Sequence, residues 1–196
     1  MSVWKLKEKS ALVLGHNMVC DAIKSALLDE GVTICSDSVE HCDILVTVPK
    51  KINSGRQNDI TISDKRWHAS MNELFEETRE LTHKVVSKMQ KQKSGRVIHV
   101  IGSHEPSTFN VEYAAWGALA AWAKSLTRVI GKDGISINLV QAGVFSGHPH
   151  ESHVPIGRPC QPHDIANLIV FLSSEYSKYI NGAIIPVDGG LSRFQH

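Results

Sequence analysis

This sequence lacks an excess of charge of either sign. Its 21 basic and 20 acidic side chains give a formal net charge of +1 at pH 7. Proteins that bind nucleic acid or anionic membranes through charge carry clustered basic residues. The small lysine groups at 50–51 and 88–93 are instead typical of solvated helix ends. We therefore expect neither nucleic acid nor a membrane surface as a partner.

Long apolar runs and paired cysteines are also missing. No window approaches the ~20 apolar residues of a membrane-spanning helix, and the first ten residues hold no apolar signal-peptide core. The cysteines Cys20, Cys35, Cys42 and Cys160 form no CxxC pair, which favours reduced, structural thiols. These absences together predict a cytoplasmic protein.

What is present is a regular alternation of strand-like and helix-like segments in one domain spanning residues 1–196. Short apolar runs predict strands at 10–15, 32–37, 43–48, 96–102, 135–143 and 183–190. Amphipathic stretches predict helices at 18–29, 64–92, 113–130 and 163–174. The alternation predicts an α/β fold, a Rossmann-like doubly wound parallel sheet. Too few residues separate the second and third strands for a crossover helix.

Several segments resemble the short-chain dehydrogenase/reductase family. KLKEKSALVLG is similar to its first strand, SGRVIHVIGS to its serine-bearing strand, and GISINLVQAG to the strand before its PG motif. The stretch IGRPCQPHDIANLIVFLSSEYSKYINGAIIPVDGG resembles the family's last helix and strand in order and spacing. The resemblance implies a shortened form of that fold. It also directs attention to the family's cofactor loop and catalytic tetrad.

The segment matching the family's dinucleotide loop has lost most of its glycines. The family pattern TGxxxGxG lets the backbone approach the pyrophosphate at a helix N-terminus. Here Gly15 remains, whereas Met18, Val19, Cys20 and Asp21 stand where small residues belong. The family's NNAG turn is TVPK, residues 47–50. We therefore expect this chain to bind no dinucleotide of its own.

The catalytic tetrad of the family is Asn, Ser, Tyr and Lys, in which the tyrosine exchanges a proton with the substrate. The corresponding positions here are Leu74, Ser103, Trp116 and Ala120, with Gly102 as an alternative match for the serine. Neither indole nor alanine transfers a proton at neutral pH. The lid after the PG-like Ala142-Gly143 is also missing, because residues 143–159 run almost directly into the last helix. From these losses we expect that this chain has no catalytic residues.

The helix expected at 113–130 is apolar nearly all round. Its apolar residues include Trp116, Leu119, Trp122 and Leu126. Such a helix is either wholly buried in the core or placed at a subunit interface. The family uses this helix for contacts between subunits. We therefore predict a pseudoenzyme subunit that supports an active, full-length short-chain dehydrogenase in a heterotetramer, with NAD on the partner.

Other functions stay open at this point. Ser103, His104, Glu105 and Tyr113 could form a non-redox lyase or isomerase site. A homomeric protein that binds a small ligand in the remaining crevice is another alternative. The motif HPHESH places His148, His150 and His153 close together, but we predict a solvated loop and no metal site, since no regular element fixes their geometry.

Overall fold

A computed structural model describes residues 3–36, 41–52, 61–102, 111–148 and 150–192. In these ranges the chain forms a six-stranded parallel sheet in the order β2-β1-β3-β4-β5-β6. The strands are β1 (Ser10–Leu14), β2 (Thr33–Cys35), β3 (Ile44–Thr47), β4 (Gly95–Ile101), β5 (Ile135–Ala142) and β6 (Ile184–Val187). The predicted doubly wound fold is confirmed, and each predicted strand is present.

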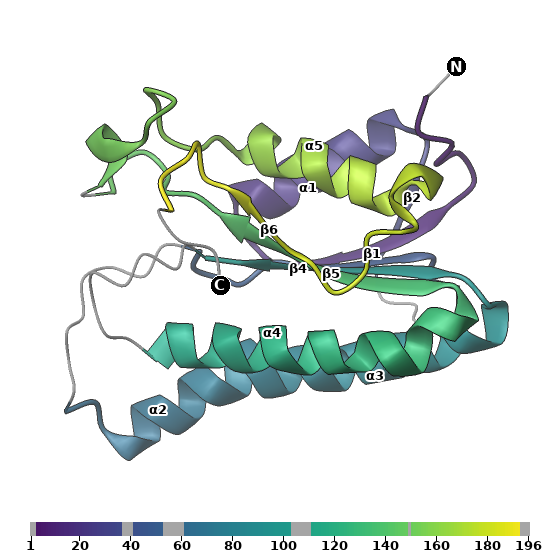
Figure 1. The fold of residues 1–196 in the computed structure, drawn as a ribbon, viewed down its shortest axis with the longest axis horizontal. Coiled ribbons are helices and arrows are strands. Elements are labelled where there is room, and N and C mark those ends of the chain that lie inside the picture. The colour runs from purple at the N-terminus through teal and green to yellow at the C-terminus, as the bar shows by residue number, and fades with distance from the viewer. Residues whose placement is uncertain (1–2, 37–40, 53–60, 103–110, 149, 193–196) are drawn as a thin grey trace.

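Helices cover both faces of the sheet (Figure 1). Helices α1 (Met18–Asp29) and α5 (Pro162–Ser173) lie on one face. The other face carries α2 (Asp64–Met71), the π-helical turn η1 (Asn72–Glu76), α3 (Glu77–Gln92) and α4 (Val111–Ile130). Three 3-10 turns complete the described elements: η2 (Gly131–Asp133), η3 (Glu151–His153) and η4 (Glu175–Ser177). No helix in these ranges is long and apolar enough to cross a bilayer.

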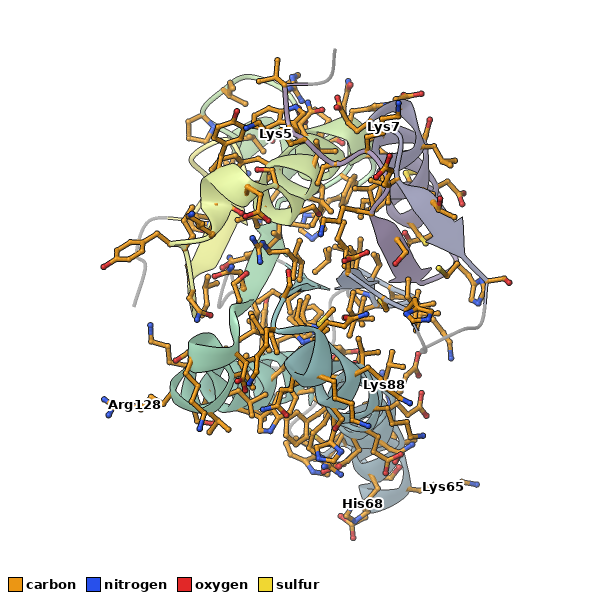
Figure 2. The ribbon with its side chains drawn as sticks, turned by 90° about the vertical axis from the view of Figure 1, so that its right-hand side faces the viewer. Lys5, Lys7, Lys65, His68, Lys88 and Arg128 are labelled. Carbon is orange, nitrogen blue, oxygen red and sulfur yellow. The ribbon has the colours of Figure 1, made fainter. Side chains whose placement is uncertain are left out.

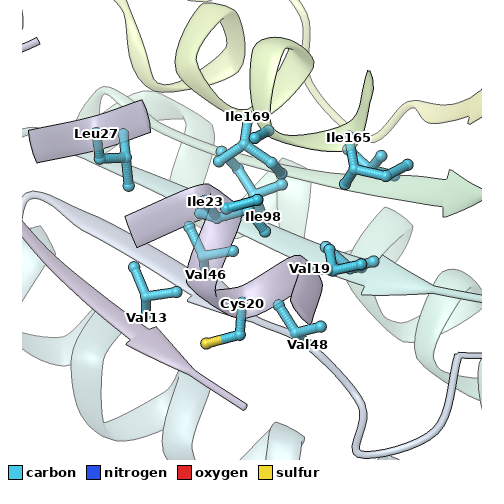
Figure 3. Packing of buried hydrophobic residues seen from close by; sticks show 14 of the residues in the cluster. Val13, Val19, Cys20, Ile23, Leu27, Val46, Val48, Ile98, Ile165 and Ile169 are labelled. Carbon is cyan, nitrogen blue, oxygen red and sulfur yellow. The ribbon is translucent and has the colours of Figure 1, made fainter. Parts of the chain in front are cut away.

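Each face of the sheet has its own apolar core. Ile23 of α1 and Ile169 of α5 meet Val46 and Ile98 of the sheet in the first core (Figure 3). The second core lies under α3 and α4, where Met89 is fully buried. Burial of aliphatic side chains on both faces is what a parallel sheet requires. Charged side chains such as Lys65 and Arg128 point outward from the helical layer (Figure 2).

The link between β2 and β3 departs from the usual crossover. β1 pairs with both strands, so the chain passes from one side of β1 to the other between residues 35 and 44. Cys42, in this link, is fully buried in the second core. The prediction that no crossover helix fits here agrees with the strand bounds. β2 is consequently an edge strand of the described sheet.

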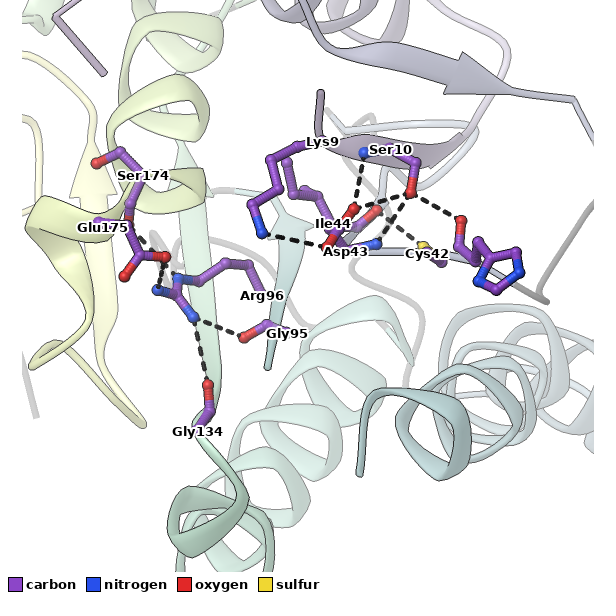
Figure 4. Close-up of polar contacts among 11 residues, drawn as sticks. Lys9, Ser10, Cys42, Asp43, Ile44, Gly95, Arg96, Gly134, Ser174 and Glu175 are labelled. Atoms are coloured by element: carbon purple, nitrogen blue, oxygen red, sulfur yellow. Dashed lines mark hydrogen bonds and ion pairs between the residues drawn. The ribbon is translucent and has the colours of Figure 1, made fainter. Parts of the chain in front are cut away.

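Polar contacts, most of them partly buried, tie the amino ends of the strands together (Figure 4). Arg96, at the start of β4, pairs with Glu175 at 3.1 Å and also donates to the Gly95 and Gly134 carbonyls. Asp43, just before β3, accepts from the Ser10 backbone N–H at 2.9 Å. These contacts join neighbouring strands at the amino edge of the sheet, opposite the edge formed by their carboxyl ends.

Candidate functional site

A cavity of about 220 Å³ opens at the carboxyl edge of β1, β3 and β4, between the sheet and the helical layer of η1, α3 and α4. Proteins with parallel α/β sheets bind ligands at this edge. The residues lining it are Leu14, Gly15, His16, Thr47, Val48, Pro49, Lys50, Glu73, Leu74, Glu77, Thr78, Leu81, Val100, Trp116 and Leu119. It therefore brings together the predicted glycine loop, the TVPK turn and two of the tetrad positions.

Trp116 forms a buried wall of this cavity. Its side chain is 2% exposed and makes an edge-on contact with Tyr113, with ring centroids 5.9 Å apart. A Cβ atom on Gly102 would lie 2.2 Å from Cη2 of this indole and 2.2 Å from the Ile52 carbonyl oxygen. Real Cβ atoms do not come this close to such atoms. The indole therefore packs directly on Gly102 and leaves no space there for a serine side chain.

The other tetrad positions carry no group for proton transfer. Leu74 lies in η1 and lines the cavity with an aliphatic side chain. Ala120 of α4 is partly buried against the second core and has no amine. Ser103 lies outside the described residues. In the described part of the site, the three remaining positions offer no acid or base.

The side chain of Asn17, the residue just before α1, caps the N-terminus of this helix. Asn17 Oδ1 accepts from the backbone N–H groups of Val19 at 3.0 Å and Cys20 at 3.1 Å. The Asn17 Nδ2 group donates to the Pro49 carbonyl at 2.8 Å. In a dinucleotide-binding protein the N–H groups at this end of the helix face the pyrophosphate. Sequence reasoning missed Asn17, although an asparagine just before a helix is a common N-cap.

The backbone conformation and the packing at position 15 both require a glycine. Its φ is +144°, and a Cβ atom there would come within 2.8 Å of the Val48 carbonyl oxygen. Bulk at this position would force β1 and β3 apart at their carboxyl ends. Met18 is 65% exposed, and Asp21 is exposed in the first turn of α1. A glycine in the loop is therefore no sign of a bound nucleotide here.

A buried polar pair lies beside the cavity. His99 of β4 is fully buried, and its Nδ1 lies 2.8 Å from the Thr47 hydroxyl oxygen. Its Nε2 atom is the one buried side-chain nitrogen or oxygen in the described ranges that has no hydrogen-bond partner. Burial lowers the pKa of His99 to about 4, so the imidazole is neutral at pH 7.

The residues of the lyase hypothesis are mostly not placed. His104 and Glu105 lie outside the described residues, as Ser103 does, so only Tyr113 is placed, half-buried in α4.

The three histidines of the HPHESH motif lie near one another. The ring centroids of His148 and His150 are 5.4 Å apart, and those of His150 and His153 are 5.7 Å apart. Within the described ranges, no group of three or more candidate ligands is arranged to hold a metal ion.

All four cysteines are free thiols, as the sequence predicted. Burial raises the pKa of Cys42 and of Cys160 to about 11, and it also raises the pKa of Cys20. A thiol must lose its proton before it acts as a nucleophile or a metal ligand. These three thiols therefore remain protonated at neutral pH, which disfavours both roles.

The predicted interface residues divide into two groups. Trp116 and Leu119 are each 2% exposed within the chain's own core. Trp122 and Leu126 are only partly buried, and Trp122 contacts Phe75 edge-on. A periodic apolar pattern cannot distinguish a core helix from an interface helix, because both bury aliphatic and aromatic side chains. The outward face of α4 begins with small exposed residues, Ala114, Gly117, Ala121 and Ser125, and continues toward its C-terminal end with the exposed Lys124 and Arg128.

Comparison with known proteins matches this chain to a family. The family model described as Enoyl-(Acyl carrier protein) reductase matches residues 3–192. The cyclohexanol dehydrogenase of Rhodococcus sp. is 38% identical over 122 residues, or 53% of this chain and 45% of that protein. The 3-oxoacyl-(acyl-carrier-protein) reductase FabG of Buchnera aphidicola is 26% identical, covering 95% of this chain and 89% of its own length.

The matches to other relatives differ in extent. FabG of Haemophilus influenzae is 31% identical over 76% of this chain and 66% of its own length, so this chain spans less than half of the cyclohexanol dehydrogenase and about two thirds of that FabG. The Buchnera match runs over 225 positions, more than the 196 residues of this chain, so that relative carries residues inside the matched region that this chain lacks. Taken with the parallel sheet and the match over residues 3–192, these findings show that the chain belongs to the short-chain dehydrogenase/reductase family.

Proposed function

We propose that this chain is a non-catalytic subunit that assembles with a complete NAD-dependent short-chain dehydrogenase and supports its activity. The observation that carries the proposal is the buried Trp116 indole packed on Gly102. It stands where the family has the tyrosine that exchanges a proton with the substrate. An indole N–H is not acidic enough at neutral pH to replace that phenol.

The residues at the cofactor position do not fit a dinucleotide. The N–H groups of Val19 and Cys20 already donate to Asn17, and the Asn17 amide is tied to the Pro49 carbonyl. A phosphate would have to displace this cap and would gain few new donors in return. We therefore assign NAD to the partner subunit and no cofactor to this chain.

The outward face of α4 supports the assembly. A Cβ atom added to Gly117 would meet nothing within 4 Å in the part of the chain that the structure describes, so no packing contact there requires a glycine. Glycine inside a helix costs about 1 kcal/mol relative to alanine. Together with the exposed Ala114 and Ala121, it lets a second helix approach closely. We propose that α4 packs there against a helix of the dehydrogenase, in a two-plus-two heterotetramer.

The substrate of the partner forms the finer part of the proposal. The pattern of losses in this chain is similar to that of the inactive subunit of the 2-(hydroxy(phenyl)methyl)succinyl-CoA dehydrogenase of anaerobic toluene degradation. We accordingly propose a hydroxyacyl-CoA as the substrate class of the active partner. The resemblance rests on the pattern of losses, which includes the positions of Leu74, Trp116 and Ala120.

The proposal predicts that a full-length family member is encoded beside this chain, and co-expression of the two chains tests it. The two chains are expected to co-purify, and NADH is expected to bind only when the partner is present. Gly117→Glu should abolish co-purification, because a charged side chain would enter the helix contact. Leu28→Glu, at an exposed position of α1 on the other face of the sheet, should not. The proposal fails if the purified chain alone binds NADH and reduces a ketone.

A further inference from the structure

The segment that follows β5 carries the three histidines of the HPHESH motif on one short turn. It projects from the molecule beside the start of α5 (Figure 1). Its first end is anchored by the Cys160 backbone N–H, which donates to the Val144 carbonyl at 2.8 Å. Near its other end, Val154 is buried in a small apolar cluster with Val144 and Leu191. The residues between these anchors depend on hydrogen bonds made within the turn.

The histidine turn, residues 145–148 and 150–153, is closed by side chains that accept from its own backbone. The Glu151 carboxylate accepts from the Gly147 N–H at 2.7 Å. His148 Nδ1 accepts from the His150 backbone N–H at 3.2 Å. The Glu151 N–H donates in turn to the His148 carbonyl at 3.0 Å. One of the acceptors that close the turn is therefore an imidazole nitrogen.

The contact at His148 requires a neutral imidazole. A ring nitrogen accepts a hydrogen bond only where it carries no proton, so the geometry assigns the ring hydrogen of His148 to Nε2. In the charged form both nitrogens carry a hydrogen, and the one on Nδ1 would face the His150 N–H. Protonation therefore replaces an attraction by a repulsion. Histidine is the side chain whose charge ordinarily changes between pH 5 and pH 8.

The other titratable groups of the turn bear on the same step. The ring centroids of His148 and His150 are 5.4 Å apart, and those of His150 and His153 are 5.7 Å apart. Like charges at such short range oppose each other, so acidification stresses the closed turn further. The Glu151 carboxylate offsets part of this repulsion, but it is already held by the Gly147 N–H.

The charged groups on the neighbouring elements have partners of their own. Arg158 pairs with Asp164 of α5 at 2.6 Å. Asp188, which follows β6, accepts from two backbone N–H groups at 2.9 Å. His163 of α5 is exposed, and burial raises the pKa of Cys160 to about 11, so this thiol stays neutral. The response of the turn to acid is therefore set mainly by its own histidines.

We propose that the histidine turn is an acid-sensitive switch, in which protonation of His148 opens the turn between its anchors while β5 and α5 stay folded. The closed turn holds the neutral imidazole, so closure is favoured at high pH and is lost as the pH falls. The opened turn exposes its backbone N–H groups to water. Opening requires neither a cofactor nor a partner, so it is independent of whether the chain assembles with a dehydrogenase.

Hydrogen–deuterium exchange followed by mass spectrometry at pH 7.5 and pH 5.5 measures the opening, on the purified chain or on its complex. Each exchange rate is divided by that of an unstructured peptide at the same pH, which gives a protection factor. The protection of the turn is expected to fall about five- to tenfold at pH 5.5, the usual contribution of one hydrogen bond. A peptide from β5 should keep its protection.

Variants at position 148 test whether this imidazole is the group that responds. His148→Asn supplies a carbonyl oxygen that can accept from the His150 N–H and does not titrate, so its turn should stay protected at both pH values. His148→Ala removes the acceptor and should give low protection at both. His163→Asn changes an exposed histidine of α5 and should behave as the unmodified chain does.

The proposal is overturned if the turn of the unmodified chain is equally protected at the two pH values. It is also overturned if His148→Asn loses protection on acidification as the unmodified chain does. A loss that persists in His148→Asn and disappears in Glu151→Gln would assign the response to the carboxylate and would equally contradict the proposal. None of these results bears on partner capture, so failure here is distinct from failure of the proposed function.

Discussion

His99 is a neutral imidazole buried in the middle of the sheet, and its burial links the stability of the chain to pH. Its pKa is about 4 in the folded chain, below the ordinary value of 6.5. Between these values the unfolded chain binds more protons than the folded chain, so the free energy of unfolding falls as the pH falls from about 6.5 to about 4. The full effect is about 3 kcal/mol.

Urea unfolding at pH 7.5 and at pH 4.5 measures this effect. His99→Asn, which does not titrate in this range, should show a much weaker decrease in stability between the two pH values. His68→Asn changes an exposed histidine and should behave as the unmodified chain does. An equal pH dependence in the unmodified chain and in His99→Asn would contradict this explanation.

Two glycines should respond to alanine in opposite ways. Gly102→Ala introduces a Cβ atom into the space held by Trp116 and the Ile52 carbonyl, and overpacking of this kind costs about 1–3 kcal/mol. Gly117→Ala meets open space and should stabilise α4 by up to about 1 kcal/mol. Chemical denaturation of both variants compares them directly. If Gly102→Ala is as stable as Gly117→Ala, the indole does not occupy the position described above.

For single residues, the sequence predicts which residue type stands at a position better than it predicts what packs around it. The match of Trp116 to the family's tyrosine position is a prediction from the sequence, whereas its contact with Gly102 depends on a loop and a helix that meet only in the fold. The sequence could not decide that Trp116 and Leu119 are buried inside the chain, because a subunit interface and a core contain the same kinds of apolar residue. The polar pair of Thr47 and His99 joins neighbouring strands that are far apart in the sequence.

Among the elements, the first turn of α1 depends on one side chain. Asn17→Ala should lower the free energy of unfolding by about 1 kcal/mol, because the N–H groups of Val19 and Cys20 lose their acceptor. Asn17→Asp keeps an acceptor for these groups and loses only the amide bond to Pro49. Thermal unfolding should therefore rank the unmodified chain and Asn17→Asp above Asn17→Ala. A melting temperature of Asn17→Ala equal to that of the unmodified chain would show that the cap contributes nothing.

The elements themselves were largely predictable. Helix α1 spans the predicted residues 18–29, as its helical apolar spacing indicated. The six strands fall within or next to their predicted ranges, because strands buried on both faces of a sheet appear as continuous apolar runs in the sequence. The single helix expected at 64–92 is divided by the π-helical turn η1. No residue pattern distinguishes residues 72–76 from regular helix. The π-helical segment lies against α4 in the fold, and this contact between distant parts of the chain is not encoded in local propensity.

Over the whole molecule, the features behind the proposed function lie at one edge of the sheet. The carboxyl edge holds the capped first turn of α1 and the Trp116 indole packed on Gly102, while the amino edge holds the ties around Arg96. Both apolar cores are filled in the described part of the chain. If the proposed function holds, NAD and this chain occur in one complex but on different subunits.

Native mass spectrometry of the assembly, purified with NAD present, distinguishes these possibilities. We expect a complex in which the 21.6 kDa chain is paired with an equal number of full-length dehydrogenase chains. The number of bound NAD molecules should equal the number of partner chains. A homo-oligomer of this chain that carries one NAD per subunit would disprove the proposed role.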